Sequence, residues 1–147
     1  MRDMGREVFR FFFRLEVTGL ENIPGPGQRV VIAPNHMSLV DGPILHSVLP
    51  KEAAFAVNTQ IAENWWVKPF LRVIRAHLLD PTKPLAARTL VNAVKAGETI
   101  VIFPEGRITV TGSLMKVYDG AAMIAALGGA KPSSLRPSTC APRISLA

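Results

Sequence analysis

One histidine and one carboxylate stand five positions apart in the segment from Pro34 to Asp41. A neutral imidazole such as that of His36 can accept a proton near neutral pH, and a carboxylate bonded to its other ring nitrogen fixes the tautomer and stabilises the imidazolium. His36 and Asp41 therefore suit a general base and its orienting partner. The serine or cysteine that would complete a hydrolase is not evident, so we expect His36 to activate a substrate hydroxyl directly.

The same segment has a structural alternative. Ser38 and Asp41 have the spacing of a capping box at the start of a helix, and Asp41 before Gly42-Pro43 is also a suitable N-cap. Because such caps are common, the pair taken alone favours the structural interpretation. A second feature of the chain has to support catalysis.

A second polar segment also directly follows a predicted buried strand. The apolar run from Thr99 to Phe103 predicts a buried strand, and Pro104 to Arg107 follows it directly, as the histidine loop follows the predicted strand from Arg29 to Ala33. In open α/β sheets, ligands bind beyond the carboxyl ends of the strands. We therefore expect the two loops to share one cleft.

The side chains of this second loop suit an anionic ligand. Arg107 offers a planar fork for a phosphate, Gly106 lets the backbone approach a ligand closely, and Glu105 can order the guanidinium or bind a hydroxyl. Lys116 follows closely enough to contact a headgroup, with a solvated surface position as the alternative. An ordinary surface turn explains this loop in isolation, but less well beside the histidine loop.

The sequence pattern around these loops predicts an α/β fold, whose strands and helices would position them. Short apolar runs alternate with stretches of helical period, which is typical of a mixed, mostly parallel sheet flanked by helices. We expect strands over 16–20, 29–33, 53–57, 76–79 and 99–103, and helices from the histidine loop to about 49, over 61–74 and over 85–95. Pro69 should kink or divide the second helix. Within it, Trp65 and Trp66 are interpreted as core residues, with a membrane belt as the alternative.

The first 15 residues form a strongly amphipathic segment. Four arginines fall on one side of a helix and apolar residues on the other. Such a helix either lies in a membrane interface, with its arginines toward anionic headgroups, or packs on the domain, and we leave both open. We divide the chain into this N-terminal helix (1–15), a partial domain over 16–127, and an irregular tail over 128–147, whose composition is poor in core residues.

Charge and composition narrow the function classes. Three of the six net positive charges lie in the last 20 residues, so the remaining excess is modest. This argues against nucleic-acid binding and suits phosphate ligands or lipid headgroups. The three histidines and Cys140 have no metal-ligand spacing and no glycine-rich nucleotide motif occurs, so we expect no metal, ATP or NAD. No apolar run approaches the roughly 18 residues of a membrane span, and His46 and His77 are expected to be structural.

The two polar blocks together resemble a known family. Asn35-His36 with Asp41, followed by Phe103 to Arg107, are similar to the first and third signature blocks of the glycerolipid acyltransferases, typified by 1-acylglycerol-3-phosphate acyltransferase. The resemblance covers about 17–126. Both blocks fall at predicted strand ends, in the order and with the approximate separation that the family has.

This resemblance implies a role for each site residue. His36 would act as general base on a glycerol hydroxyl and Asp41 would orient it. The block from Glu105 to Arg107, together with Asn35 and Lys116, would bind the acceptor, a lysophospholipid, through its phosphate. The acyl donor would be a thioester of coenzyme A or acyl carrier protein, and no cofactor is implied.

A finer resemblance extends over Leu79 to Pro84 and Arg107 to Gly120. These stretches are similar to the acyltransferase portion of bacterial bifunctional 2-acylglycerophosphoethanolamine acyltransferase/acyl-acyl carrier protein synthetases. This implies phospholipid synthesis or repair at the cytoplasmic face of the bacterial inner membrane. The chain would be peripheral or part of a larger membrane protein.

The chain departs from the family pattern at two places. Asp80-Pro81 stands where the second block usually ends in an arginine, with Arg75 or Lys83 as candidate substitutes. After Ala126 the family continues with a further strand, whereas this chain has tail composition, which predicts a sheet that is incomplete at its C-terminus. The alternative functions are therefore a catalytically inactive fragment that binds lipid or membrane, and a thioester hydrolase.

Overall fold

The computed structural model describes residues 11, 16–18, 28–36, 38, 40–50, 52–80, 82–106, 119–138 and 143–146. The strands within these residues form one sheet in the order β1-β7-β6-β2-β5-β3-β4. Their bounds are β1 (Glu16–Thr18), β2 (Val30–Pro34), β3 (Ala54–Asn58), β4 (Arg75–Leu79), β5 (Thr99–Val101), β6 (Lys131–Ser138) and β7 (Arg143–Leu146). Neighbouring strands are parallel except β6 and β7.

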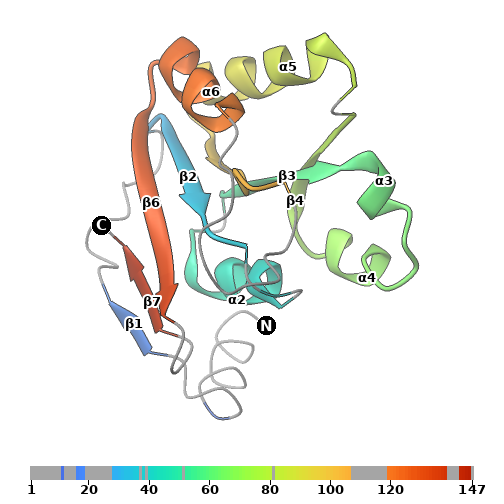
Figure 1. Ribbon diagram of the computed structural model, residues 1–147, viewed down its shortest axis with the longest axis vertical. Coiled ribbons are helices and arrows are strands. Elements are labelled where there is room, and N and C mark those ends of the chain that lie inside the picture. The colour runs from blue at the N-terminus through green and yellow to red at the C-terminus, as the bar shows by residue number, and fades with distance from the viewer. Residues whose placement is uncertain are drawn as a thin grey trace.

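Helices cover both faces of this sheet. They are α2 (Asp41–Val48), α3 (Thr59–Ala62), α4 (Lys68–Leu71), α5 (Pro84–Lys95) and α6 (Gly120–Gly128). In Figure 1, α5 and α6 lie together on one side of the strands, and α2 lies on the other. The mixed, mostly parallel α/β fold predicted from the sequence is confirmed.

The alternation of side chains along β2 gives the sheet two separate cores. Val30 and Ile32 pack with residues of α2 and with Ile74 on one face, whereas Val31 packs on the other face. Successive residues of a strand point to opposite faces, so a strand covered on both sides has to be apolar throughout. This requirement explains the unbroken apolar runs by which β2 and β5 were predicted.

The face formed with α5 and α6 is closely packed. Leu90, Val91 and Val94 of α5 meet Ile124 and Ala125 of α6, all of them buried. The two helices approach so closely that a Cβ added to Gly128, at the end of α6, would lie 2.5 Å from Cγ1 of Val94. The absence of a side chain at residue 128 therefore sets how near α6 lies to α5.

The predicted helix over 61–74 is divided, as Pro69 allowed. The structure has two short helices, α3 and α4, and Pro69 lies in the first turn of α4, where its missing N–H costs no helical hydrogen bond. Trp65 and Trp66 lie between them and are 81% and 44% exposed. Their interpretation as core residues is wrong. The two short helices α3 and α4 form a helical hairpin between β3 and β4, and other side chains of this hairpin contact the core.

The predicted irregular tail is corrected by β6 and β7. Residues 131–138 pair in parallel with β2, and residues 143–146 pair with both β6 and β1. β6 was not predicted because its prolines and serines lack the apolar period that marks a buried strand, and β7 was not predicted because its four residues are too few to establish a period. Pairing with β2 is a property of the backbone, which composition does not encode.

The membrane-related predictions fall partly outside the described residues. Of the amphipathic segment over 1–15, only residue 11 is described. Across the described ranges, no helix combines the length and the apolar character that crossing a bilayer requires.

Candidate active site

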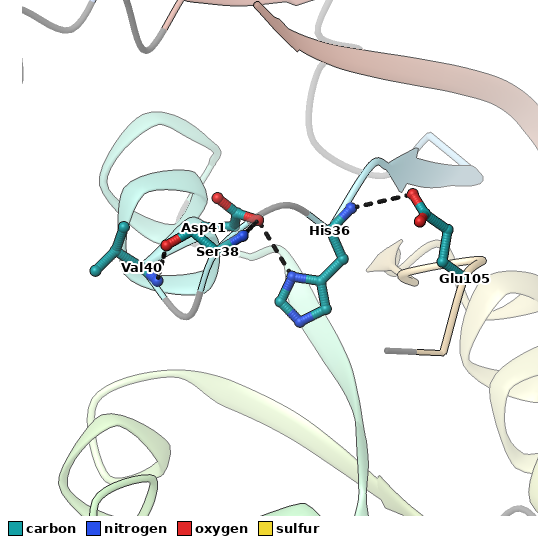
Figure 2. Close-up of polar contacts among 5 residues, drawn as sticks. All are labelled: His36, Ser38, Val40, Asp41 and Glu105. Carbon is teal, nitrogen blue, oxygen red and sulfur yellow. Dashed lines mark hydrogen bonds and ion pairs between the residues drawn. The ribbon is translucent and has the colours of Figure 1, made fainter. Parts of the chain in front are cut away.

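His36 lies two residues beyond β2, at the edge where the carboxyl ends of β2, β5 and β3 meet. Its Nδ1 lies 3.2 Å from Oδ2 of Asp41, as Figure 2 shows. The two side chains are only 19% and 15% exposed. The structure therefore brings the predicted base and its carboxylate into hydrogen-bond contact in a partly desolvated place.

This contact determines which ring nitrogen can act as a base. An ionised carboxylate only accepts hydrogen bonds, so the Asp41 contact requires the proton of a neutral His36 ring to be on Nδ1. Nε2 then carries the lone pair, and it points away from the Asp41 carboxylate in Figure 2. When Nε2 takes a proton, the nearby carboxylate stabilises the positive charge on the ring.

Asp41 also organises the start of α2. It is the first residue of the helix, and its Oδ2 accepts a hydrogen bond from the backbone N–H of Ser38 at 2.7 Å. The Ser38 hydroxyl in turn accepts from Val40 N at 3.4 Å. The helix N-terminus favours a negative charge at this position. The Asp41 carboxylate thus accepts from the Ser38 N–H, as in a capping box, and also contacts the imidazole. The expectation that Asp41 is itself the N-cap is wrong, because Val40 occupies that position, and the catalytic role of Asp41 stays a prediction.

The second loop is a tight turn that its own proline and glycine favour. Gly106 N donates to Phe103 O at 3.1 Å, which closes a four-residue turn. Pro104 occupies the second position, where its fixed φ is favourable, and Gly106 has φ of 65°, a conformation that glycine adopts without strain. Glu105 is thereby held at the third position of the turn.

Glu105 connects the two loops. Its Oε1 accepts a long hydrogen bond, 3.4 Å, from the backbone N–H of His36, which is 69 positions away in the sequence. In Figure 2 the Glu105 carboxylate reaches His36 from the opposite side to Asp41. Glu105 is only 2% exposed. The predicted convergence of the loops is confirmed, and the Glu105 carboxylate lies inside the protein against the backbone of the histidine loop.

The contact of Phe103 with His36 was not predicted from the sequence. The His36 ring stacks on the Phe103 ring with centroids 4.1 Å apart and an interplanar angle of 23°. Two contacts, one with a carboxylate and one with an aromatic face, hold the imidazole in one orientation. The aromatic residue directly before the Pro104 turn was the available signal, but the pattern alone did not indicate which way its ring points.

The structure describes some of the other predicted site residues but not all of them. Asn35, next to His36, is half-buried and Gly106 is exposed, whereas Arg107 and Lys116 lie outside the described residues. Their roles as acceptor ligands stay predictions. Within the described part of the chain, no three histidine, cysteine or carboxylate side chains are grouped to hold a metal ion.

The remaining histidines have structural contacts. His46 packs against Phe55 and Phe70, with ring centroids 6.4 and 6.3 Å away. His77 Nε2 lies 3.0 Å from Oε2 of Glu98. These contacts agree with the structural roles expected for both residues.

Comparison with known proteins assigns the chain to a family. The profile of the acyltransferase family matches residues 14–134, a range that contains both loops. The chain belongs to the acyltransferase family. The matched range extends into β6, so the strand that composition did not predict is part of the family domain.

Curated relatives of this chain carry a common name. The 1-acyl-sn-glycerol-3-phosphate acyltransferase of Bacillus subtilis is 31% identical over 119 residues, which is 79% of this chain and 58% of the relative. The chloroplastic 1-acyl-sn-glycerol-3-phosphate acyltransferase of Arabidopsis thaliana is 29% identical over 122 residues, which is 80% of this chain and 34% of the relative. The chain thus spans about three fifths or less of these relatives.

The fold of this chain is also found in a solved structure. The crystal structure of the 1-acyl-sn-glycerophosphate acyltransferase from Thermotoga maritima matches with a TM-score of 0.72 at 23% identity. The match covers 99% of this chain and 64% of that one. The strands β6 and β7 and the loops around His36 and Glu105 therefore belong to one acyltransferase fold.

Proposed function

We propose that this protein transfers a fatty acyl group from an acyl thioester to a free glycerol hydroxyl of a lysophospholipid. The observation that carries the proposal is the His36 ring, whose Nδ1 contacts Asp41 while the backbone of the same residue is bonded to buried Glu105. Such an arrangement supplies a fixed base, which suits direct attack by a substrate hydroxyl.

The reaction follows from this geometry in two proton steps. His36 Nε2 removes the proton of the glycerol hydroxyl as that oxygen attacks the thioester carbonyl, and Asp41 stabilises the imidazolium. The tetrahedral intermediate then collapses, an ester bond forms and the carbon–sulfur bond breaks. The imidazolium returns its proton to the departing thiolate, so the enzyme ends in its initial state. General-base assistance of this kind contributes a factor of roughly 10² to 10⁴ in rate.

The acceptor is recognised by its phosphate in this proposal. Arg107, which directly follows Gly106 in the sequence, and Lys116 supply the positive charge for the phosphate, and Gly106 and Asn35 are the further acceptor-binding residues that we propose. The names of the curated relatives support 1-acylglycerol-3-phosphate as acceptor. The resemblance of 79–84 and 107–120 to the bifunctional enzymes supports 2-acylglycerophosphoethanolamine. The donor is acyl-acyl carrier protein or acyl-coenzyme A.

The proposed acceptor indicates where in the cell the protein works. A lysophospholipid acceptor resides in a bilayer, so the protein works on a membrane surface. We place it at the cytoplasmic face of a bacterial inner membrane, peripherally or within a larger membrane protein, in phospholipid synthesis or repair.

A transfer assay tests the proposal. The protein is incubated with labelled acyl-acyl carrier protein or acyl-coenzyme A and a panel of lysophospholipids that differ in headgroup, and the products are separated by chromatography. We expect labelled diacyl phospholipid with at least one pair. Free fatty acid released without acceptor would instead indicate a thioester hydrolase. Vesicle binding with neither product would indicate an inactive lipid-binding module.

A further inference from the structure

The helical hairpin of α3 and α4, between β3 and β4, presents apolar side chains to solvent. Trp65 is 81% exposed, Trp66 44% and Val73 54%. Single exposed apolar residues are common on protein surfaces and need no explanation. Two adjacent exposed tryptophans form an apolar patch, and such patches are typical of interaction sites. We call the exposed set Trp65, Trp66, Lys68, Pro69, Arg72 and Val73 the tryptophan face.

The fold itself separates this face from the core. Lys68 N donates to Asn64 O, Leu71 N to Val67 O and Ile74 N to Phe70 O, so the backbone winds helically from residue 64 to residue 74. The residues of this stretch that contact the core are Val67, Phe70, Leu71 and Ile74. Because the core-facing residues already anchor the hairpin, the tryptophan face is not required for its folding.

The charges on the tryptophan face have one sign. From Asn64 to Ile74 the chain contains two basic residues, Lys68 and Arg72, both exposed, and no acidic residue. Indole rings are amphipathic and collect at the boundary between headgroups and acyl chains, and neighbouring basic side chains attract anionic headgroups. This combination is complementary to the surface of an anionic phospholipid bilayer.

The hairpin also starts at the edge of the sheet that carries the site. Helix α3 begins at Thr59, directly after β3, and β3 is parallel to β5, which is parallel to β2. The carboxyl ends of these strands therefore lie along one edge, with the His36 and Glu105 loops. In Figure 1, α3 and α4 lie side by side at the end of the sheet, beyond β3.

We propose that the tryptophan face docks this protein on an anionic bilayer. The choice of a bilayer over an acidic protein partner rests on the proposed function, because a lysophospholipid acceptor is presented by a membrane. Its residues are distinct from those of the amphipathic segment over 1–15.

The chain carries its own reporter for this surface. Its only two tryptophans are Trp65 and Trp66, so intrinsic tryptophan emission comes from the tryptophan face alone. The full chain is titrated with vesicles of phosphatidylglycerol and phosphatidylethanolamine that contain no lysolipid and no donor. We expect a blue shift of the emission and quenching by lipids brominated in their acyl chains. The shift should be smaller with pure phosphatidylcholine vesicles.

A matched pair of variants tests binding without fluorescence. We expect the double variant Trp65→Ala/Trp66→Ala to bind vesicles at least roughly tenfold more weakly in flotation, because apolar area that enters the interface is lost. The control is Met123→Ala/Leu127→Ala on α6, which removes side chains that are 45% and 58% exposed on the other face of the sheet. The control should bind as the unaltered chain does, within about twofold.

Several outcomes would overturn the proposal. These are vesicle binding without blue shift or quenching, absence of vesicle binding, equal losses in the two double variants, and an emission change caused by acyl carrier protein but not by vesicles. A short-chain lysophospholipid that stays monomeric in solution separates this test from the proposed function. The Trp65→Ala/Trp66→Ala variant should turn it over as the unaltered chain does, and failure of both chains would refute the acyltransferase proposal alone.

Discussion

The two faces of the sheet differ in what their helices contact. On one face α5 and α6 pack tightly against Val31 and Ile100, and Gly128 lies against Val94 without room for a Cβ. On the other face α2 packs on Ile32 and Phe55, but its first residue, Asp41, contacts the side chain of His36. The first face is occupied by packing alone, whereas the second combines packing with the proposed chemistry.

This difference shows how one sheet separates stability from function. Close helix packing tolerates few changes in volume, so the α5–α6 face is where small substitutions should unfold the protein. The site depends on a few polar contacts at the edge of the sheet, so changes there should reduce activity with less effect on folding. Substitutions on each side can test whether the separation holds.

The largest expected effect is the loss of the proposed base. His36→Ala removes Nε2, and we expect turnover in the acyl-transfer assay to fall by about 10² to 10⁴. The thermal unfolding midpoint should change little, because His36 lies in the loop between β2 and α2 and is not a core residue. The control is His77→Gln, which replaces a histidine bonded to Glu98 outside the site and should retain activity. Near-normal turnover by His36→Ala would refute the base assignment.

Replacement of Glu105 should affect both properties. Glu105→Ala removes the acceptor of the His36 N–H, and a buried polar group left without its partner costs about 1–3 kcal/mol of unfolding free energy. The turnover should also fall, since the imidazole is no longer held in place. Glu105→Gln keeps an amide oxygen at the same distance and should recover much of the stability. The assignment fails if Glu105→Ala alters the acceptor KM and leaves both kcat and the denaturant midpoint unchanged.

Overfilling the opposite face should reduce stability alone. Gly128→Ala places a Cβ within 2.5 Å of Val94 Cγ1, and we expect a loss of about 1–3 kcal/mol in chemical denaturation. The activity per folded molecule should be retained. Gly120→Ala is the control, because a Cβ there meets no atom within 4 Å. Combination of Gly128→Ala with Val94→Ala should give a smaller loss than the two single changes added together, since they share one space.

The smallest expected effect lies at the surface, after β4. Hydrogen bonds from the Thr82 hydroxyl and N–H hold the pKa of Asp80 below its ordinary value of 3.8. A lowered pKa in the folded state stabilises the protein above the ordinary value, and this contribution disappears as the pH falls through the folded value. Thr82→Ala should raise the pKa of Asp80 toward 3.8, which NMR titration of the carboxyl carbon can measure. An unchanged pKa would show that the hydroxyl contributes nothing.

Sequence patterns predicted the parts of the molecule that depend on local chemistry. The strands β2 to β5 and the helices α2 and α5 came from apolar period and turn residues, with ends within a few positions of those observed. The pairing of His36 with Asp41 followed from their types and spacing. The burial of Glu105 did not, because a Pro-Glu-Gly turn is ordinarily exposed and only the fold places it behind the histidine loop.

The errors arose where long-range contacts outweigh local composition. Trp65 and Trp66 fit a core helix by residue type, yet Val67 and Phe70 take the core positions and the tryptophans face outward. Residues 131–138 have the composition of a tail, yet they extend the sheet beside β2. In both cases the deciding factor is which neighbour the backbone meets.

The sequence by itself determined the fold class, the turn at Pro104 to Gly106 and the chemical identity of the proposed base and its carboxylate, because each depends on residues close together in the chain. Only the tertiary structure decided that Glu105 is buried against the His36 backbone, that Phe103 stacks on the imidazole, and that two tryptophans are exposed. The physical reason is that parallel strands align the ends of segments up to 69 positions apart, and burial there is set by the assembled sheet.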